Sequence, residues 1–235
     1  ACVFQYNRLI LMESESTVKK ASLNLFACLW LVGALAVPAA ARRVPQQEPP
    51  GRDPAFEQEI YERLEAINAA AVPIFQEATR AMDAWDFESA KQGFERVLEL
   101  APDFPDALRR LSHTELQLGN VEAAVEHARQ AQAADPVSPY NRSALAFALL
   151  STGDPHDAAE ALTHASAAAE MLPDDADVNF ILLYAGLVRE DIDVIRRASA
   201  ALVRVAPDDP FGHYGAGIAA AYDEKWEQAE RELLL

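Results

Sequence analysis

The feature that most constrains the fold of this chain is the regular spacing of four prolines: Pro102, Pro136, Pro173 and Pro207. Successive members are 34, 37 and 34 residues apart, within the similar segments LELAPDF, AQAADPV, AEMLPDD and VRVAPDD. Twelve residues before each proline lies a small or aliphatic side chain, in order Ala90, Ala124, Ala161 and Ile195. A period in this range is typical of stacked supersecondary units that bury their apolar faces against one another.

The units are predicted to be helical throughout. Only 9 of the 235 residues are glycine, whereas alanine and leucine are abundant and runs of β-branched residues are few. From Pro54 onward apolar residues recur at helical spacing, as in the stripe Phe56, Ile60, Leu64 and Ile67. A single long coiled coil is excluded because glycine and proline interrupt the pattern in every half unit.

These segments resemble tetratricopeptide repeats, which are pairs of antiparallel helices with small residues where the two helices touch. With each late proline at position 32, small residues occupy positions 8 and 20, as Ala78 and Ala90 do in the first unit. The frame divides the array at 71–235 into units 71–104, 105–138, 139–175, 176–209 and 210–235. The resemblance implies an all-α fold, a right-handed α-solenoid of stacked antiparallel helix pairs.

The fourth and fifth units depart from the pattern. Leu183 stands at the small position 8 of the fourth unit, and Arg189–Glu190 replaces the turn glycine. In the fifth unit Ala229 stands at position 20, so the matching proline would be due at position 241. We therefore expect the chain to be interrupted within its fifth unit.

The segment before the array has the order of an export signal. Residues 12–41 carry Lys19 and Lys20, then an apolar stretch, then Pro38 and three alanines, which predicts a cleaved signal peptide. The alternative is an uncleaved membrane anchor over residues 21–41, since about 20 apolar residues suffice to span a bilayer. We expect residues 1–11 to be a non-native upstream segment, residues 42–53 a Pro-rich linker, and residues 54–72 a helix that Pro73 ends or kinks. The predicted location is periplasmic or otherwise extracytoplasmic.

Composition and motifs argue against catalysis and against nucleic-acid binding. The net charge of −17 repels nucleic acid and anionic membranes. Both cysteines, Cys2 and Cys28, precede the array, so thiol chemistry is absent from it. The five histidines form no metal-binding motif, and no serine stands in a Gly-x-Ser-x-Gly sequence. We expect no metal, no cofactor and no enzyme activity within these residues.

The resemblance implies that the first helix of each pair lines a concave groove and that ligands contact positions 2, 5, 9, 12 and 13. The residues predicted there for a protein or peptide partner are Phe75, Arg109, His113, Tyr140, Phe147, Phe180, Tyr184, Phe211, Tyr214 and Tyr222. Thr79, Met82, Gln117, Ser143, Leu187 and Ile218 take further groove positions. About half of these side chains are expected to pack as core instead.

Such a groove suits an extended or helical peptide with apolar anchors, and Arg109 is predicted to be available for a carboxylate. The clamp for carboxylate tails in chaperone-binding members is absent, because Phe75 and Ser143 replace its lysines and Thr79 its asparagine. The sequence therefore predicts an exported protein–protein interaction scaffold. One alternative is the N-terminal interaction region of a longer enzyme or membrane protein that continues beyond residue 235. Another is a structural spacer without a ligand.

Overall fold

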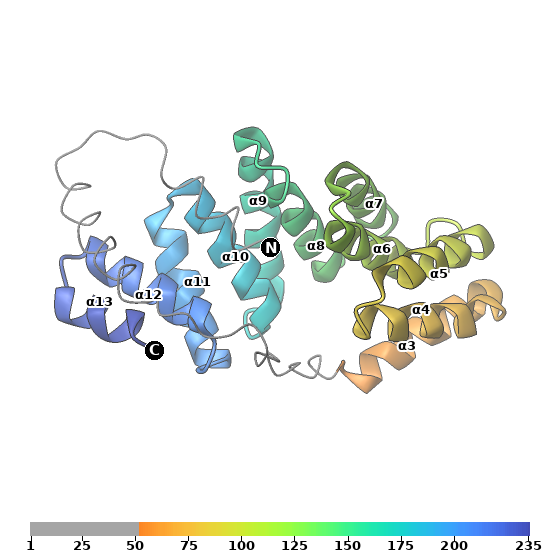
Figure 1. The fold of residues 1–235 in the computed structure, drawn as a ribbon, viewed down its shortest axis with the longest axis horizontal. Coiled ribbons are helices and arrows are strands. Elements are labelled where there is room, and N and C mark those ends of the chain that lie inside the picture. Colours follow the sequence, from red (N-terminus) through yellow and green to blue (C-terminus); the bar gives the residue numbers. More distant parts are fainter. Residues whose placement is uncertain (1–51) are drawn as a thin grey trace, which may run out of the picture. The chain divides into compact units, whose positions relative to one another are not determined.

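A computed structural model describes residues 52–235, and every regular element in that range is a helix (Figure 1). Predictions for residues 1–51, including the signal peptide and most of the linker, lie outside the described residues. The helices are α3 (Pro54–Asn68), α4 (Ala71–Asp83), α5 (Phe87–Leu100), α6 (Pro105–Leu118), α7 (Val121–Ala134), α8 (Pro139–Leu150), α9 (Pro155–Met171), α10 (Ala176–Arg189), α11 (Ile192–Val205), α12 (Pro210–Tyr222) and α13 (Trp226–Leu233).

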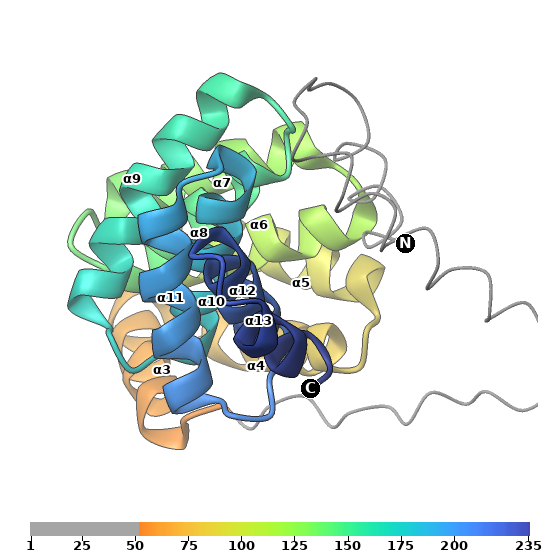
Figure 2. The same ribbon diagram turned by 90° about the vertical axis from the view of Figure 1, so that its left-hand side faces the viewer.

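From α4 onward the helices pack as five consecutive pairs. The first helices of the pairs are α4, α6, α8, α10 and α12. Each contacts its own partner, and the first four also contact the first helix of the next pair. Seen end-on in Figure 2, the pairs are turned relative to one another rather than stacked in parallel. The all-α solenoid expected from the sequence is confirmed.

Helix starts follow from local chemistry. The side chains of Ser138 and Asp209 accept hydrogen bonds from backbone N–H groups of the next turn, and a proline occupies the first helical position after each. Proline is tolerated there because the first N–H groups of a helix have no partner within it. These caps fix where α8 and α12 begin.

The turns inside the pairs need left-handed backbone. Gly119 and Gly153 take it with φ of 83° and 73°. In the fourth unit, whose turn has no glycine, Glu190 ends α10 with φ of 54°. A non-glycine residue is strained in this region, so the turn geometry of the repeat persists there at a local cost.

Small side chains let the two helices of a pair approach closely. Ala90, Ala124 and Ala161 are fully buried, and Ser112 on α6 donates a 2.8 Å hydrogen bond to the carbonyl of Ala124 on α7. At Gly93 of α5 an added Cβ would lie only 2.6 Å from the Cβ of Ala78 on α4. Larger side chains at these contacts would push the helices apart.

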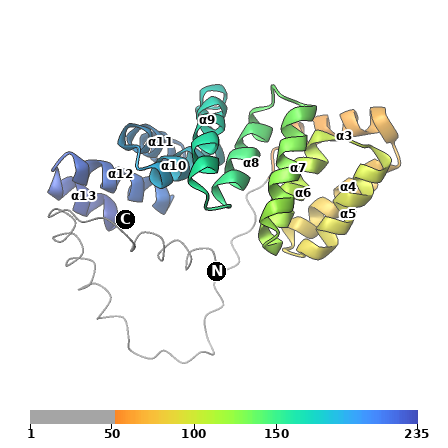
Figure 3. The same ribbon diagram turned by 90° about the horizontal axis from the view of Figure 1, so that it is seen from above.

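The helix expected over residues 54–72 is shorter than predicted. α3 ends at Asn68, and Pro73 lies in the first turn of α4, where its missing N–H is tolerated. Ile67, counted in the apolar stripe, is 57% exposed, whereas Glu57 is buried. Figures 1 and 3 both place α3 along α4 on the side away from α5.

No helix between residues 52 and 235 has the length and apolar character needed to cross a bilayer.

Candidate binding surface

The residues predicted to contact a partner lie on the first helices of the five pairs, and these helices follow one another in space. We call the surface made by α4, α6, α8, α10 and α12 the A face. Its two halves differ, because α3 lies over one half and not over the other.

The N-terminal half of the A face is closed. Phe75 was predicted to line an open groove, but it is 0% exposed, so that prediction is wrong. Its ring makes edge contacts with Tyr61 of α3, 6.2 Å away, and with Phe94 and Phe104, 5.7 and 6.0 Å away. Thr79 and Met82, also groove positions, are buried as well. Tyr61 of α3 is one of the side chains that cover Phe75, and Arg110, the partner of Glu57 on α3, binds Thr79.

The contacts of α3 reach three successive units. Glu57 pairs with Arg110 of α6, and Arg63 pairs with Asp106 of the same helix at 2.8 Å. The ring of Phe56 lies 4.8 Å from that of Tyr140 on α8. Just before the helix, Arg52 pairs with Asp83 at the end of α4. The helix therefore crosses the A face of the first two units and touches the third.

Arg110 is the central polar group beneath α3. It is 2% exposed, its guanidinium binds Glu57 and the hydroxyl of Thr79, and it lies 4.6 Å from the ring centre of Phe75. Burial lowers the pKa of Arg110 to about 10. The negative charge of Glu57 opposes this decrease. The side chain remains protonated at neutral pH. Sequence reasoning missed it because its partner lies 53 residues away.

Arg109, His113 and Tyr140 border the covered region. Arg109 was predicted to be available for a carboxylate, but it already binds Asp106 at 2.8 Å and lies 5.8 Å from the ring centre of Tyr140. His113 is exposed. The surrounding protein, with the charges of Arg52 and Arg109, lowers the pKa of His113 and so favours its neutral form. This border therefore has no uncommitted arginine.

The C-terminal half of the A face brings three predicted aromatic residues together. The ring of Phe180 on α10 lies 5.1 Å from that of Phe211 on α12, edge to face, and 6.5 Å from that of Tyr184. Phe211 is 48% exposed, and the other two are half-buried. We call these three residues the aromatic cluster. It joins the A faces of the fourth and fifth units.

The remaining predicted residues lie on the same helices with different exposure. Phe147 on α8 and Tyr214 on α12 are half-buried, and burial raises the pKa of the Tyr214 hydroxyl. Tyr222, at the end of α12, is 69% exposed.

Acidic side chains border the aromatic cluster. Asp175 caps α10 and Asp209 caps α12, so both stand at the starts of the helices that carry the three rings. Asp177 follows in the first turn of α10, and burial together with the charges of Asp175 and Asp209 raises its pKa. Acids at helix starts are favoured by the helix dipole, so each of them has a local role as well. Their shared location required the stacking of α10 against α12.

Comparison with known proteins agrees with this geometry. The family model for the tetratricopeptide repeat matches residues 75–139. Residues 75–139 are therefore assigned to the tetratricopeptide-repeat family, and the described residues as a whole have the helix-pair solenoid fold of that repeat. By sequence, no curated protein matches it.

Several solved structures share the fold. MamA, residues 41 to the end, from Desulfovibrio magneticus RS-1 has a TM-score of 0.60 at 17% identity, covering 72% of this chain and 93% of its own. Pseudomonas aeruginosa PilF scores 0.62 at 16% identity, over 71% and 75% of the two chains. YrrB, described as a tetratricopeptide-repeat protein with an unusual peptide-binding site, scores 0.55 at 19% identity, over 74% and 88%.

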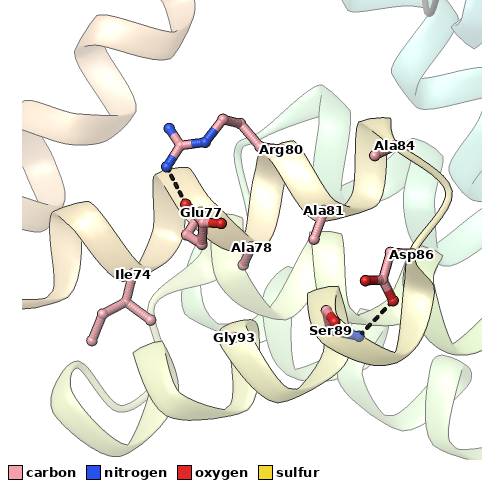
Figure 4. Close-up of a pocket in the computed structure, with 9 residues that line it drawn as sticks. All are labelled: Ile74, Glu77, Ala78, Arg80, Ala81, Ala84, Asp86, Ser89 and Gly93. Atoms are coloured by element: carbon pink, nitrogen blue, oxygen red, sulfur yellow. Dashed lines mark hydrogen bonds and ion pairs between the residues drawn. The ribbon is translucent and has the colours of Figure 1, made fainter.

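A separate hollow of about 410 Å³ lies between α4 and α5 of the tetratricopeptide array (Figure 4). Its floor is made of small residues, including Ala78, Ala81 and Gly93. The polar groups drawn at its rim are already paired: Arg80 with Glu77, and Asp86 with the backbone N–H of Ser89. The hollow results from missing side-chain volume and presents no free polar group to orient a ligand.

The described residues, 52–235, contain no candidate metal site of three or more side chains. No group of three or more histidine, cysteine, aspartate or glutamate side chains is placed there to hold an ion.

Proposed function

We propose that this protein is an interaction scaffold that binds a peptide on the C-terminal half of its A face. The observation that carries the proposal is the aromatic cluster. Phe180, Tyr184 and Phe211 form a continuous, partly exposed apolar surface on two adjacent helices. Partly exposed aromatic rings held in place by a rigid scaffold are the side chains that most often dominate peptide affinity.

The acids beside the cluster define the chemistry of the partner. Asp175, Asp177 and Asp209 would repel an acidic peptide and attract a basic one. We therefore propose a ligand with apolar anchors flanked by lysine or arginine. The description of YrrB as having a peptide-binding site agrees with this kind of role for the fold, and the role proposed for the described residues is binding rather than catalysis.

The test is a selection of peptides from a random displayed library against the full chain, followed by affinity measurement of the selected peptides. We expect sequences with apolar and basic residues. The triple variant F180A/Y184A/F211A should lose binding at least tenfold, as expected when aromatic anchors are truncated. The matched control is Trp85→Ala, which removes an aromatic side chain that is 65% exposed at the end of α4. Peptides that bind the folded triple variant as tightly as the wild type would refute the proposal.

We also propose that the scaffold is exported, on the basis of the charged, apolar and small-residue order of residues 12–41. Expression with a periplasmic reporter and N-terminal sequencing of the mature chain test this. A mature N-terminus near residue 42 supports cleavage, and an intact N-terminus in the membrane fraction supports the anchor. A chain found intact in the cytosol contradicts export. The alternative, an interaction region of a longer enzyme or membrane protein, is tested by reading the gene beyond codon 235.

A further inference from the structure

The position of α3 is not that of a helix continuing the stack. In a repeat array each unit contacts only its immediate neighbours. α3 instead contacts α4 through Tyr61, α6 through Glu57 and Arg63, and α8 through Phe56. It also lies on the side of α4 away from α5 (Figure 1), so it covers positions at which this fold presents its A face.

The contact of α3 combines a small buried apolar part, which joins the first group of core side chains, with polar and partly exposed groups. Only two apolar side chains of α3 are fully buried, Ile60 and Leu64. The rest of the contact consists of the ion pairs of Glu57 and Arg63 and the ring contacts of Phe56 and Tyr61. Interfaces between parts of one chain that move relative to each other have this mixed polar and apolar composition.

The surface under α3 selects for a carboxylate. Arg110 is buried beneath α3, and its positive charge is paired with the carboxylate of Glu57. A helix that covered Arg110 without supplying an acid would leave a buried charge unpaired, which is strongly unfavourable. α3 has four glutamates and one arginine, of which Glu57 faces Arg110 and Arg63 faces Asp106, whereas Glu59, Glu62 and Glu65 are exposed. The surface thus recognises an acidic amphipathic helix.

We propose that the faces of α4, α6 and α8 beneath α3 form a second docking site, for an acidic amphipathic helix, which α3 occupies in cis and from which a partner helix of the same chemistry displaces it. The partner helix carries two apolar residues four positions apart, as Ile60 and Leu64 are, and a glutamate three positions before the first of them. The proposal is independent of the aromatic cluster, which lies on α10 and α12.

The tether explains why α3 holds the site in the absence of a partner. Only Ala69 and Ala70 separate α3 from α4, so the helix is present at a high effective concentration. Asn68 holds the connection: its side chain donates a 3.1 Å hydrogen bond to the carbonyl of Leu100 and accepts one of 3.1 Å from the backbone N–H of Ala70. A free helix must overcome this advantage, so displacement requires a tight or abundant partner.

The first test uses the full chain and a fluorescent synthetic peptide of residues 52–69. The variant F56A/R63A loosens α3 without altering the core of α4–α13, since Arg63 is exposed and Phe56 is only half-buried. We expect this variant to bind the peptide at least tenfold more tightly than the wild type does. Ile67→Ala, on an exposed part of the same helix, should leave the wild-type affinity unchanged. A peptide with Glu57→Gln should bind the variant at least tenfold more weakly.

A covalent crosslink that holds α3 in place tests the opposite case, in which the helix cannot be displaced. In a chain with Cys2→Ser and Cys28→Ser, F56C/Y140C is joined by a short bismaleimide, because these two rings are in contact in the native chain. The locked chain should not bind the peptide. If the locked and loosened chains bind it equally, the peptide binds elsewhere and the proposal is overturned.

Amide hydrogen exchange of the wild-type chain tests the same inference without any variant. We expect the amides of α3 to exchange at least tenfold faster than those of α6, and saturating peptide to speed exchange in α3 further. Amides of α3 that are protected as strongly as those of α6, with no response to the peptide, would make α3 a permanent part of the fold and overturn the proposal.

Discussion

At the scale of single residues, the fourth unit shows how a departure from the repeat pattern is accommodated. Leu183 occupies a position that is small in the other units, yet it is almost fully buried. Room for it comes from α12: a Cβ added at Gly215 would lie 2.7 Å from a terminal carbon of Leu183 and 2.8 Å from the Cβ of Ser199. The missing side chain of one unit thus compensates for the large side chain of another.

This compensation predicts energetic coupling between the two positions. Gly215→Ala should destabilise the chain by about 1–3 kcal/mol, because its Cβ overlaps Leu183. In a Leu183→Ala background the same substitution should cost less, since only the Ser199 contact remains tight. Urea denaturation of the four proteins of this double-mutant cycle measures the difference. Additive free energies of unfolding would show that Gly215 is not the source of the space.

The small residues inside the pairs make a second prediction. Ala124→Leu places three further carbons between α6 and α7 at a fully buried site and should lower the free energy of unfolding by about 1–3 kcal/mol. Ala133→Leu is the matched control, because Ala133 is exposed on the same helix. Its effect should stay within about 0.5 kcal/mol in the same urea titration. Equal losses for both variants would contradict the close-packing argument.

These residues also show which features of the structure can be predicted from the sequence. A small residue where two helices touch, or a proline after a capping serine, constrains structure through its own shape, so Ala124 and Pro139 could be assigned in advance. Phe75 could not, because its burial depends on where a separate helix docks. The pair Glu57–Arg110 links residues 53 positions apart, and no local pattern contains that information.

At the scale of elements, α13 is held to α12 partly by a titrating contact. The ring of His213 lies 2.8 Å from a carboxylate oxygen of Glu232 on α13 and 2.8 Å from the carbonyl of Pro207. The hydrogen bond to Glu232 and that to the Pro207 carbonyl raise the pKa of His213 above its ordinary value of 6.5. The contact therefore favours the protonated ring.

The sign of the pH dependence follows from the raised pKa. The stabilisation is fully present below pH 6.5 and is lost as the pH rises through the higher pKa of the folded state. We expect wild-type chain to be more stable than His213→Gln at about pH 5.5, with the difference shrinking towards about pH 8.5. Thermal denaturation followed by circular dichroism at several pH values measures it.

Glu232→Gln provides the control for that experiment, because it removes the charged partner and keeps the size of the side chain. It should reproduce the pH response of His213→Gln. A difference between wild type and His213→Gln that is constant across the range would mean that the ring acts through packing alone.

The element scale also separates what could be predicted from what could not. The existence of α3 follows from the apolar stripe of residues 56–64, and its start follows from Asp53 and Pro54. Its location does not follow, because the same amphipathic helix could cap the first pair or cross several. The contacts of Arg63 and Phe56 with α6 and α8 decide between these, and they exist only in the assembled array.

At the scale of the whole molecule, residues 52–235 contain two separate groups of buried apolar side chains. One extends from Ile60 to Leu111, and the other from Ala128 to Leu202. They meet at α7, which buries only three alanines, one of them the Ala128 of the second group. Alanine contributes little apolar area, so the junction is weaker than the packing on either side of it. In a solenoid such a junction divides the array into regions that open separately.

This division makes the last prediction. Phe94→Ala removes a fully buried ring from the first group and Leu149→Ala a fully buried side chain from the second. Each substitution should cost about 2–5 kcal/mol in its own region. Amide exchange measured by mass spectrometry should therefore speed up in α3–α6 for Phe94→Ala and in α8–α11 for Leu149→Ala. The other region should change less, because the two groups of buried apolar side chains are separate, although α6 contacts α8 directly. If both variants accelerate exchange equally across all helices, the array unfolds as one cooperative unit, and the contacts of α6 and α7 with α8 couple the two groups far more strongly than their separation predicts.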